Sequence, residues 1–139
     1  MATTIATITL ASSDIADNTL SVSNTMTLTT AGTDTGITET TGLARKKVAS
    51  ASLADLITVA NTDVTAAKSA KVYIKNTSTA TDKWGLIGIG DSSGTPIYIG
   101  RLYGGDWMLF PWDANSGEDI TLTMSDSTET TIEYMVFFE

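Results

Sequence analysis

The stretch RLYGGDWMLFPWDA, residues 101–114, decides the fold. Four of its residues are aromatic, two adjacent glycines interrupt it, and a proline lies near its end. Adjacent glycines supply the positive φ angles that tight hairpin turns need. We therefore expect Tyr103-Gly104-Gly105-Asp106 to form the hairpin turn between a strand at 96–102 and a strand at 107–112.

The strand at 107–112 is apolar on both of its faces. Side chains alternate along a strand, so Trp107 and Leu109 share one face, and Met108, Phe110 and Trp112 share the other. A strand of this kind must be covered on both sides. Since only one face of a sheet in a two-layer sandwich meets the core, the second face must be covered by the N-terminal segment or by another subunit.

The pattern of short strands extends over the whole C-terminal half. Short strands separated by turn-rich links are typical of an antiparallel sandwich or barrel. We predict an all-β fold, an antiparallel β-sandwich of jelly-roll type with an extended β-rich N-terminal segment. Strand 120–124 alternates apolar residues with threonine, which predicts one face in water. The expected strands of the body are 70–76, 84–89, 96–102, 107–112, 120–124 and 131–138.

The aromatic residues suggest where the chain divides. Residues 1–66 contain none of the ten aromatic residues, and 67–139 contain all of them. Large rings supply much of the burial in a small core. We therefore expect a β-sandwich body at 67–139 and an N-terminal arm at 1–66 that borrows its burial from the body or from a partner.

Within the arm, residues 5–10 (IATITL) and 20–29 (LSVSNTMTLT) read as strands. The second is expected to be half-buried, because Leu20, Val22, Met26 and Leu28 share one face. Residues 30–42 are expected to form a loop.

The segment ASASLADLITVA, residues 49–60, fits two structures. Leu53, Leu56, Ile57 and Ala60 fit a helical face, which Ser52 and Asp55 could cap, and Leu56–Val59 fits a strand. The β-rich surroundings favour a strand.

Composition excludes several classes of function. The net charge of −8 disfavours binding to nucleic acid, which depends on neutralising phosphates with basic residues. The chain has no cysteine, and it has neither a recognisable signal peptide nor an apolar run long enough to span a membrane. We expect that the protein is synthesised in a cytoplasm and does not associate with a membrane. The 26 threonines agree with a β-rich protein.

The sequence offers little catalytic chemistry. It contains no histidine, which removes histidine-activated nucleophiles and the commonest metal ligand. The segment GDSSGTP, residues 90–96, therefore reads as a hairpin loop. We predict no catalytic residue, no cofactor and no metal ligand.

Acidic and aromatic side chains near the aromatic strand leave three alternatives open. Paired carboxylates beside rings are typical of glycoside hydrolases, and carboxylates in loops can bind calcium. The acidic candidates are Asp106, Asp113, Glu118 and Asp119. Alternatively, Tyr103, Trp107 and Trp112 could form a platform that binds a glycan, although such rings more often pack in a core or an interface.

Three consecutive basic residues, Arg45-Lys46-Lys47, precede the ambiguous segment. They are the first basic residues of the chain. A triplet of this kind either contacts an acidic partner surface or lies in a solvated loop.

Several segments together resemble a known class of proteins. The chain is similar to small virion structural proteins of tailed bacteriophages, especially those of marine cyanophage-type genomes. The resemblance is strongest over residues 71–139. It rests on KVYIKNTST (71–79), IYIGRLYGGDWMLFPWDA (97–114), TIEYMVFFE (131–139) and TTGLARKKV (40–48).

The resemblance implies a structural role in the virion without fixing the position there, and we expect the capsid surface. Small all-β phage proteins often decorate or cement the capsid as trimers, whereas others belong to the neck, tail or fibres. We expect a decoration protein that contacts the major capsid protein and sister copies, and the alternative is a tail or fibre module that binds a host glycan. The expected interface residues are Arg45, Lys46, Lys47, Tyr103, Trp107, Phe110 and Trp112.

Overall fold

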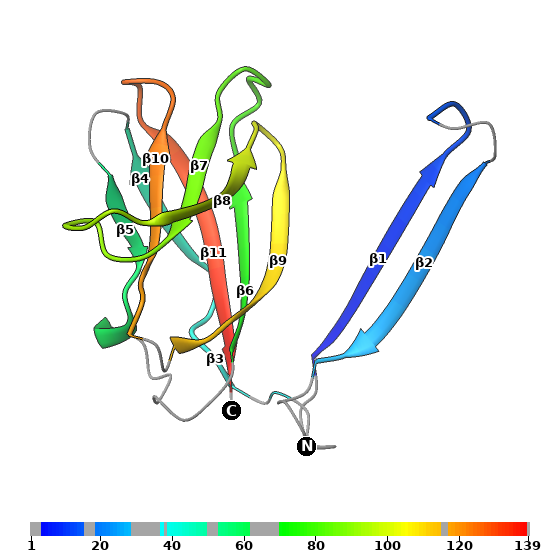
Figure 1. The fold of residues 1–139 in the computed structure, drawn as a ribbon. Helices are drawn as coiled ribbons and strands as arrows, with labels where there is room; N and C mark the ends of the chain where they lie inside the picture. Colours follow the sequence, from blue (N-terminus) through cyan, green and yellow to red (C-terminus); the bar gives the residue numbers. More distant parts are fainter. Residues whose placement is uncertain are drawn as a thin grey trace. The chain divides into compact units, whose positions relative to one another are not determined.

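A computed structural model describes residues 4–15, 19–28, 37, 39–49, 53–61, 70–114 and 117–138. The chain forms two compact units, residues 1–38 and 39–139. Both units consist mainly of β-strands (Figure 1).

Unit 1 is a long antiparallel hairpin. Strand β1 (Ile5–Ser12) pairs with β2 (Leu20–Thr27) along its whole length. The pairing continues at the base, where the Leu28 amide donates to the Thr4 carbonyl over 2.8 Å. The Ile37 amide then donates to the Leu28 carbonyl, also over 2.8 Å, so the chain returns to the hairpin base just before unit 2 begins.

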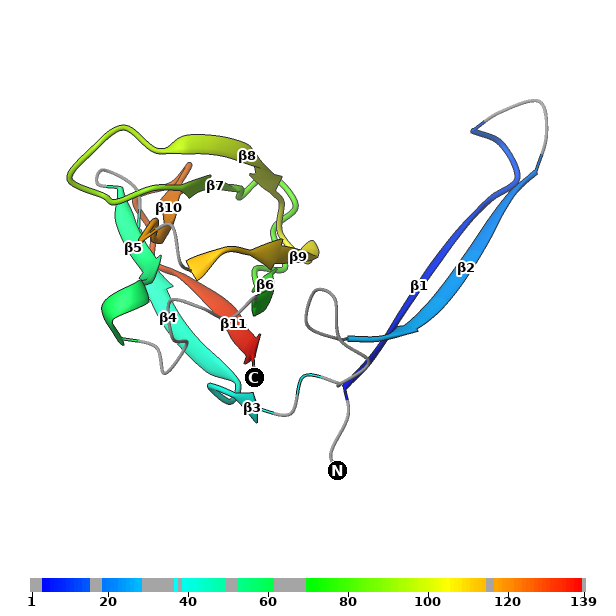
Figure 2. The ribbon, with the colours of Figure 1, turned by 60° about the horizontal axis from the view of Figure 1, so that its bottom comes forward.

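Unit 2 is an antiparallel sandwich of two sheets, as the sequence predicted (Figures 1 and 2). One sheet has the order β5-β10-β7-β8. The other has the order β3-β11-β6-β9, with β4 also paired to β11. The strands are β3 (Glu39–Thr40), β4 (Ala44–Val48), β5 (Ala54–Ile57), β6 (Ala70–Asn76), β7 (Gly85–Ile89), β8 (Ile97–Leu102), β9 (Trp107–Trp112), β10 (Ile120–Met124) and β11 (Thr130–Phe138). A short 3₁₀ helix, η1 (Val59–Asn61), follows β5.

The core fills the space between the two sheets. Strand β6 alternates strictly between buried and half-buried residues, as expected for the centre of a sheet with one face on the core. Both sheets contribute aliphatic side chains, so burial does not depend on aromatic rings alone. The core includes Val48, Leu56, Val72, Ile74, Ile87, Leu102, Trp112, Ile120, Leu122, Ile132, Val136 and Phe138.

All six strands predicted for the body are present, with ends that differ by at most one residue. The strand interpretation of residues 49–60 is confirmed for Ala54–Ile57 (β5), whereas Val59 and Ala60, also assigned to the strand or to a helical face, belong to η1. The domain boundary differs from the prediction: it falls at residues 38/39 rather than 66/67. The described residues of 39–61 belong to the body because β3, β4 and β5 pair within its two sheets.

The segment Tyr103–Asp106 forms a turn, as predicted, but it does not close a hairpin. The Asp106 amide donates to the Tyr103 carbonyl over 2.9 Å, and Gly105 has a φ of 88°. The strands on either side belong to different sheets, since β8 pairs with β7 and β9 pairs with β6. The turn is therefore a corner that carries the chain from one sheet to the other.

The prediction that β10 has one face in water is wrong. Thr121 lies on the outer face of its sheet and is nevertheless fully buried. The space above its neighbour Gly88 is filled by the side chains of Thr121, Pro96 and Tyr98. The loop that joins β7 to β8 reaches β5, where the Asp55 carboxylate accepts hydrogen bonds from the amide and hydroxyl of Ser92 over 2.8 and 2.7 Å. This loop covers the outer face around Thr121.

The prediction that strand 20–29 is half-buried is also wrong for β2, whose eight residues are all exposed. The expected face exists, since Leu20, Val22 and Met26 lie on one side of the hairpin. A two-stranded hairpin has no second layer of its own, so the alternation does not produce burial. Of the predicted loop at 30–42, residues 30–36 and 38 lie outside the described residues, and β3 occupies 39–40.

Candidate interaction surfaces

Three surfaces with exposed or half-buried apolar side chains stand out on the described parts of the chain. The first is the outer sheet face, the side of the five-stranded sheet that points away from the core. The strand register places on it residues of β6, β9 and β11. These are Lys71, Tyr73 and Lys75, Trp107, Leu109 and Pro111, and Glu133, Met135 and Phe137.

The centre of the outer sheet face is apolar. Leu109, Tyr73 and Met135 lie side by side across three strands and are half-buried, and Trp107 beside them is 52% exposed. Burial raises the pKa of the Tyr73 hydroxyl, and the negative charge of Glu133 raises it further. The sequence correctly assigned Trp107 and Leu109 to a face opposite that of Met108, Phe110 and Trp112.

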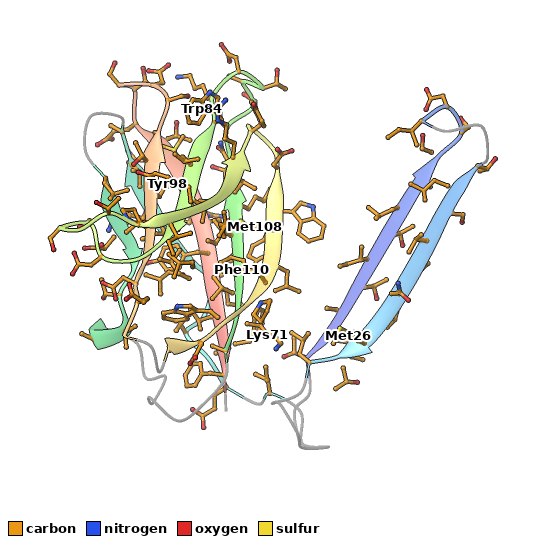
Figure 3. The ribbon with its side chains drawn as sticks, viewed as in Figure 1. Met26, Lys71, Trp84, Tyr98, Met108 and Phe110 are labelled. Carbon is orange, nitrogen blue, oxygen red and sulfur yellow. The ribbon has the colours of Figure 1, made fainter. Side chains whose placement is uncertain are left out.

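Two predicted interface residues point into the body instead. Trp112 is 4% exposed, and its indole nitrogen Nε1 donates to the Glu118 carbonyl over 3.0 Å. Phe110 packs against the core beside Met108, as Figure 3 shows. Both lie on the inner face of β9, which leaves Tyr103 and Trp107 as the accessible rings of the predicted set.

The basic triplet lies on β4 and contacts other parts of unit 2. Arg45 forms an ion pair with Glu133 at 2.9 Å, and Lys47 lies 3.7 Å from Glu129. The Lys46 ammonium donates to the Asp55 carbonyl and so joins the edge strands β4 and β5 of the two sheets. These contacts supply a structural reason for the triplet, while the side chains of Arg45 and Lys47 stay largely exposed.

The second surface is the β8 surface, formed by Ile97, Tyr98 and Ile99. Their side chains are 75%, 49% and 47% exposed, and β8 is an edge strand of its sheet. The nearby Arg101 side chain makes a cation–π contact within the chain, since its guanidinium carbon lies 4.2 Å from the centre of the Trp84 ring. Edge strands are usually protected by charge or proline against pairing with other chains. The run IYI at residues 97–99 is a sequence signal for this surface, although the predicted interface residues do not include it.

The third surface is the hairpin's apolar face. Partners in an antiparallel pair share a face, so one side of the hairpin carries almost only apolar side chains: Ala6, Ile8, Leu10, Leu20, Val22 and Met26, with Asn24 and Ser12. Figure 3 shows side chains standing out from both sides of the ribbon. The opposite side carries Ile5 and Ala11 among hydroxyl residues, where Thr7 and Thr25 hydrogen-bond over 2.9 Å.

A small hollow lies where the edges of the two sheets meet. It has a volume of about 270 Å³ and is lined by Lys46, Asp55, Leu56, Tyr134 and neighbouring residues of β4, β5 and β11. It is too small for an extended chain or a drug-sized ligand. It would admit only a small molecule.

The four acidic candidates do not form one site. Asp106 precedes β9 and Asp113 follows it, so about 23 Å of extended chain separates them. Glycoside hydrolases hold their two carboxyl groups within about 10 Å. Asp106 accepts a hydrogen bond from the Tyr103 amide over 2.9 Å and Asp119 accepts one from the Val59 amide over 2.8 Å, so both stabilise loops.

Comparisons with known proteins give no relative. No protein-family model, no curated protein and no solved structure matches this chain. Within the described residues, no cluster of acidic side chains could hold a metal ion. No helix in the same described ranges is long and apolar enough to cross a bilayer.

Proposed function

We propose that this protein is a structural component of a tailed-phage virion, a decoration or cement protein on the capsid surface. In this proposal it acts by adhesion between protein subunits. Each copy would bind sister copies, in a homotrimer, and the subunits of the major capsid protein. The resemblance of segments 71–79, 97–114 and 131–139 to small virion proteins supports this assignment.

The observation that carries the proposal is the presence of three separate surfaces with exposed or half-buried apolar side chains on a chain of 139 residues. Contiguous exposed apolar surface marks sites of association. One surface suffices for one partner, whereas a protein that bridges several neighbours needs several. Weak contacts made at several sites at once add up to strong attachment, because each bound site raises the effective concentration of the next.

The β8 surface is the one we assign to the shell. We expect the substitution Ile97→Lys to lower attachment to empty shells by at least tenfold, because it places a charge in the most exposed apolar residue of that surface. Folding should be unaffected, since the Ile97 side chain is 75% exposed. The measurement is co-sedimentation of purified protein with shells that lack it, over a range of protein concentrations.

The matched control is Ser93→Lys, which adds the same charge at an exposed position of the neighbouring loop. We expect this variant to bind shells like the unmodified protein. Failure of the unmodified protein to bind shells contradicts the proposed function. Normal binding by both variants shows that the β8 surface is not the shell contact.

A second candidate is a glycan-binding module of a tail or fibre. Tyr103 and Trp107 flank the same turn and are 41% and 52% exposed, and exposed rings are common in sugar-binding sites. A glycan array probed with the purified protein tests this function. Binding that is lost in Trp107→Ala supports the second candidate, and an array without hits removes it.

A further inference from the structure

The hairpin of unit 1 lacks what a stable β-structure needs. An isolated two-stranded hairpin is at best marginally stable in water, and it gains stability when an apolar face packs on another layer. Its apolar face presents Ile8, Leu10 and Met26 at 43%, 54% and 56% exposure. The backbone pairing is nevertheless continuous over eight residue pairs. The regular, one-sided pattern indicates a covered face in the assembled protein.

The outer sheet face is comparable in two respects. Its centre is apolar, with Lys71, Lys75 and Glu133 beside it, and its strands β6 and β11 contain seven and nine residues, against eight in each hairpin strand. Eight residues of strand extend about 27 Å, so the two surfaces match in length. The hairpin strands carry no charged residue, so packing along β6 and β11 would place no charge of the hairpin against Tyr73 and Met135 or against the neighbouring Lys71, Lys75 and Glu133.

The short connection between the units favours a neighbouring copy as the acceptor. The Ile37 amide is bonded to the hairpin base, and Glu39 already belongs to β3, so one residue joins the two units. A fold-back onto its own sheet would have to be completed within that connection. Short connections oppose such closure and favour exchange of the element between copies.

We propose that the hairpin's apolar face packs over the outer sheet face of a second copy of this chain, as a third β-layer. Each copy then makes the contact twice, once through its hairpin and once through its sheet. Two paired strands cover an area of about 27 by 10 Å. A single contact of that size is well below the roughly 800 Å² per partner of a standard interface. The contact is therefore stable only in a closed assembly, where it is repeated.

This inference deepens the proposed function, since it assigns the contact between sister copies and leaves the β8 surface for the shell. The absence of cysteine from the chain makes the test direct. Two single variants, Leu10→Cys on the hairpin and Leu109→Cys on the sheet, are co-expressed with tags of different size. The purified mixture is treated with a short thiol-reactive bis-maleimide reagent, and the product is identified by denaturing electrophoresis.

We expect a cross-linked species that contains one copy of each variant. The matched control pairs Thr9→Cys, on the hydroxyl-rich side of the hairpin, with Leu109→Cys, and should cross-link at least fivefold less. Met135→Cys serves as a second sheet position, in case the change at Leu109 disturbs folding. Equal cross-linking from Thr9 and Leu10, or none from Leu10 to either sheet position, overturns the inference.

The double variant Leu10→Cys with Leu109→Cys separates exchange between copies from closure within one chain. Exchange produces cross-linked chains of two or more copies, whereas closure within a chain produces a cross-linked monomer and overturns the inference. Shell binding is measured on the same samples. Cross-linked copies that fail to bind shells support the inference and contradict the proposed function. Shell binding without cross-linking supports the proposed function and overturns the inference.

Discussion

Replacement of Gly104 by alanine is expected to lower the free energy of unfolding by about 3 kcal/mol. An added Cβ would meet the carbonyl oxygen of Ala80, and it would lie 2.8 Å from that carbonyl carbon and 3.0 Å from the Ser78 oxygen. All three atoms are backbone and cannot rotate away. The corner between β8 and β9 packs against this loop, so the clash must move one of them. Chemical denaturation of the variant measures the loss.

Gly105→Ala is the matched control in the same turn. Gly105 has a φ of 88°, where alanine is strained, but an added Cβ would meet no atom within 4 Å. We expect a cost of about 1 kcal/mol, that of the left-handed conformation alone. If Gly104→Ala were as mild as Gly105→Ala, the close approach of the turn to residues 78–80 would be incorrect.

The second large effect is expected at Asn76, which is fully buried at the end of β6. Its side-chain nitrogen donates to the carbonyls of Lys83 and Leu102 over 3.0 and 3.1 Å, and its oxygen accepts from the Ser78 amide over 3.0 Å. Asn76→Ala leaves three backbone groups, one buried and two part-buried, without this partner. Each such loss costs about 1 kcal/mol or more, so we expect a total of about 3 kcal/mol in chemical denaturation.

Asn76→Asp has almost the same shape and tests whether the two hydrogen bonds donated by the Asn76 side chain account for the stability. The introduced carboxyl cannot donate twice, and when ionised it faces two carbonyl oxygens, so its pKa in the folded protein lies above its usual range. Ionisation is then favoured in the unfolded chain, and the variant loses stability relative to the unmodified protein as the pH rises above about 4. Thr79→Ala, at an exposed position of the same loop, should be nearly neutral. A pH-independent difference would contradict this account.

Much of the body could be predicted from the sequence because its strands are short, regular and bounded by turn residues. Strand 107–112 was correct in its ends and in its faces, since a period of two fixes which residues share a side. Strand β4 was missed because Arg45-Lys46-Lys47 has the charge of a solvated loop. Only the pairing with β11, which places Arg45 opposite Glu133, shows that the charges suit an edge strand.

The errors share a cause, which is that burial depends on what lies above a strand. Thr121 is polar and points to the outer face, as the alternation predicts, yet the loop after β7 covers it. Met26 is apolar and alternates correctly, yet it is 56% exposed because the hairpin has only two strands. Similarly, the four aromatic residues of 101–114 could not be divided into core and surface without the pairing of β9 with β6. That pairing places Trp112 inside and Trp107 outside.

The central claim is that copies of this chain associate through apolar sheet faces. The most direct test is the mass of the purified protein in solution, measured by light scattering after size exclusion at several concentrations. The chain has a mass of 14.6 kDa. We predict a closed oligomer of about three times that mass, which Leu10→Lys on the hairpin's apolar face converts to monomer without unfolding unit 2. A monomer of about 15 kDa at every concentration would contradict the claim.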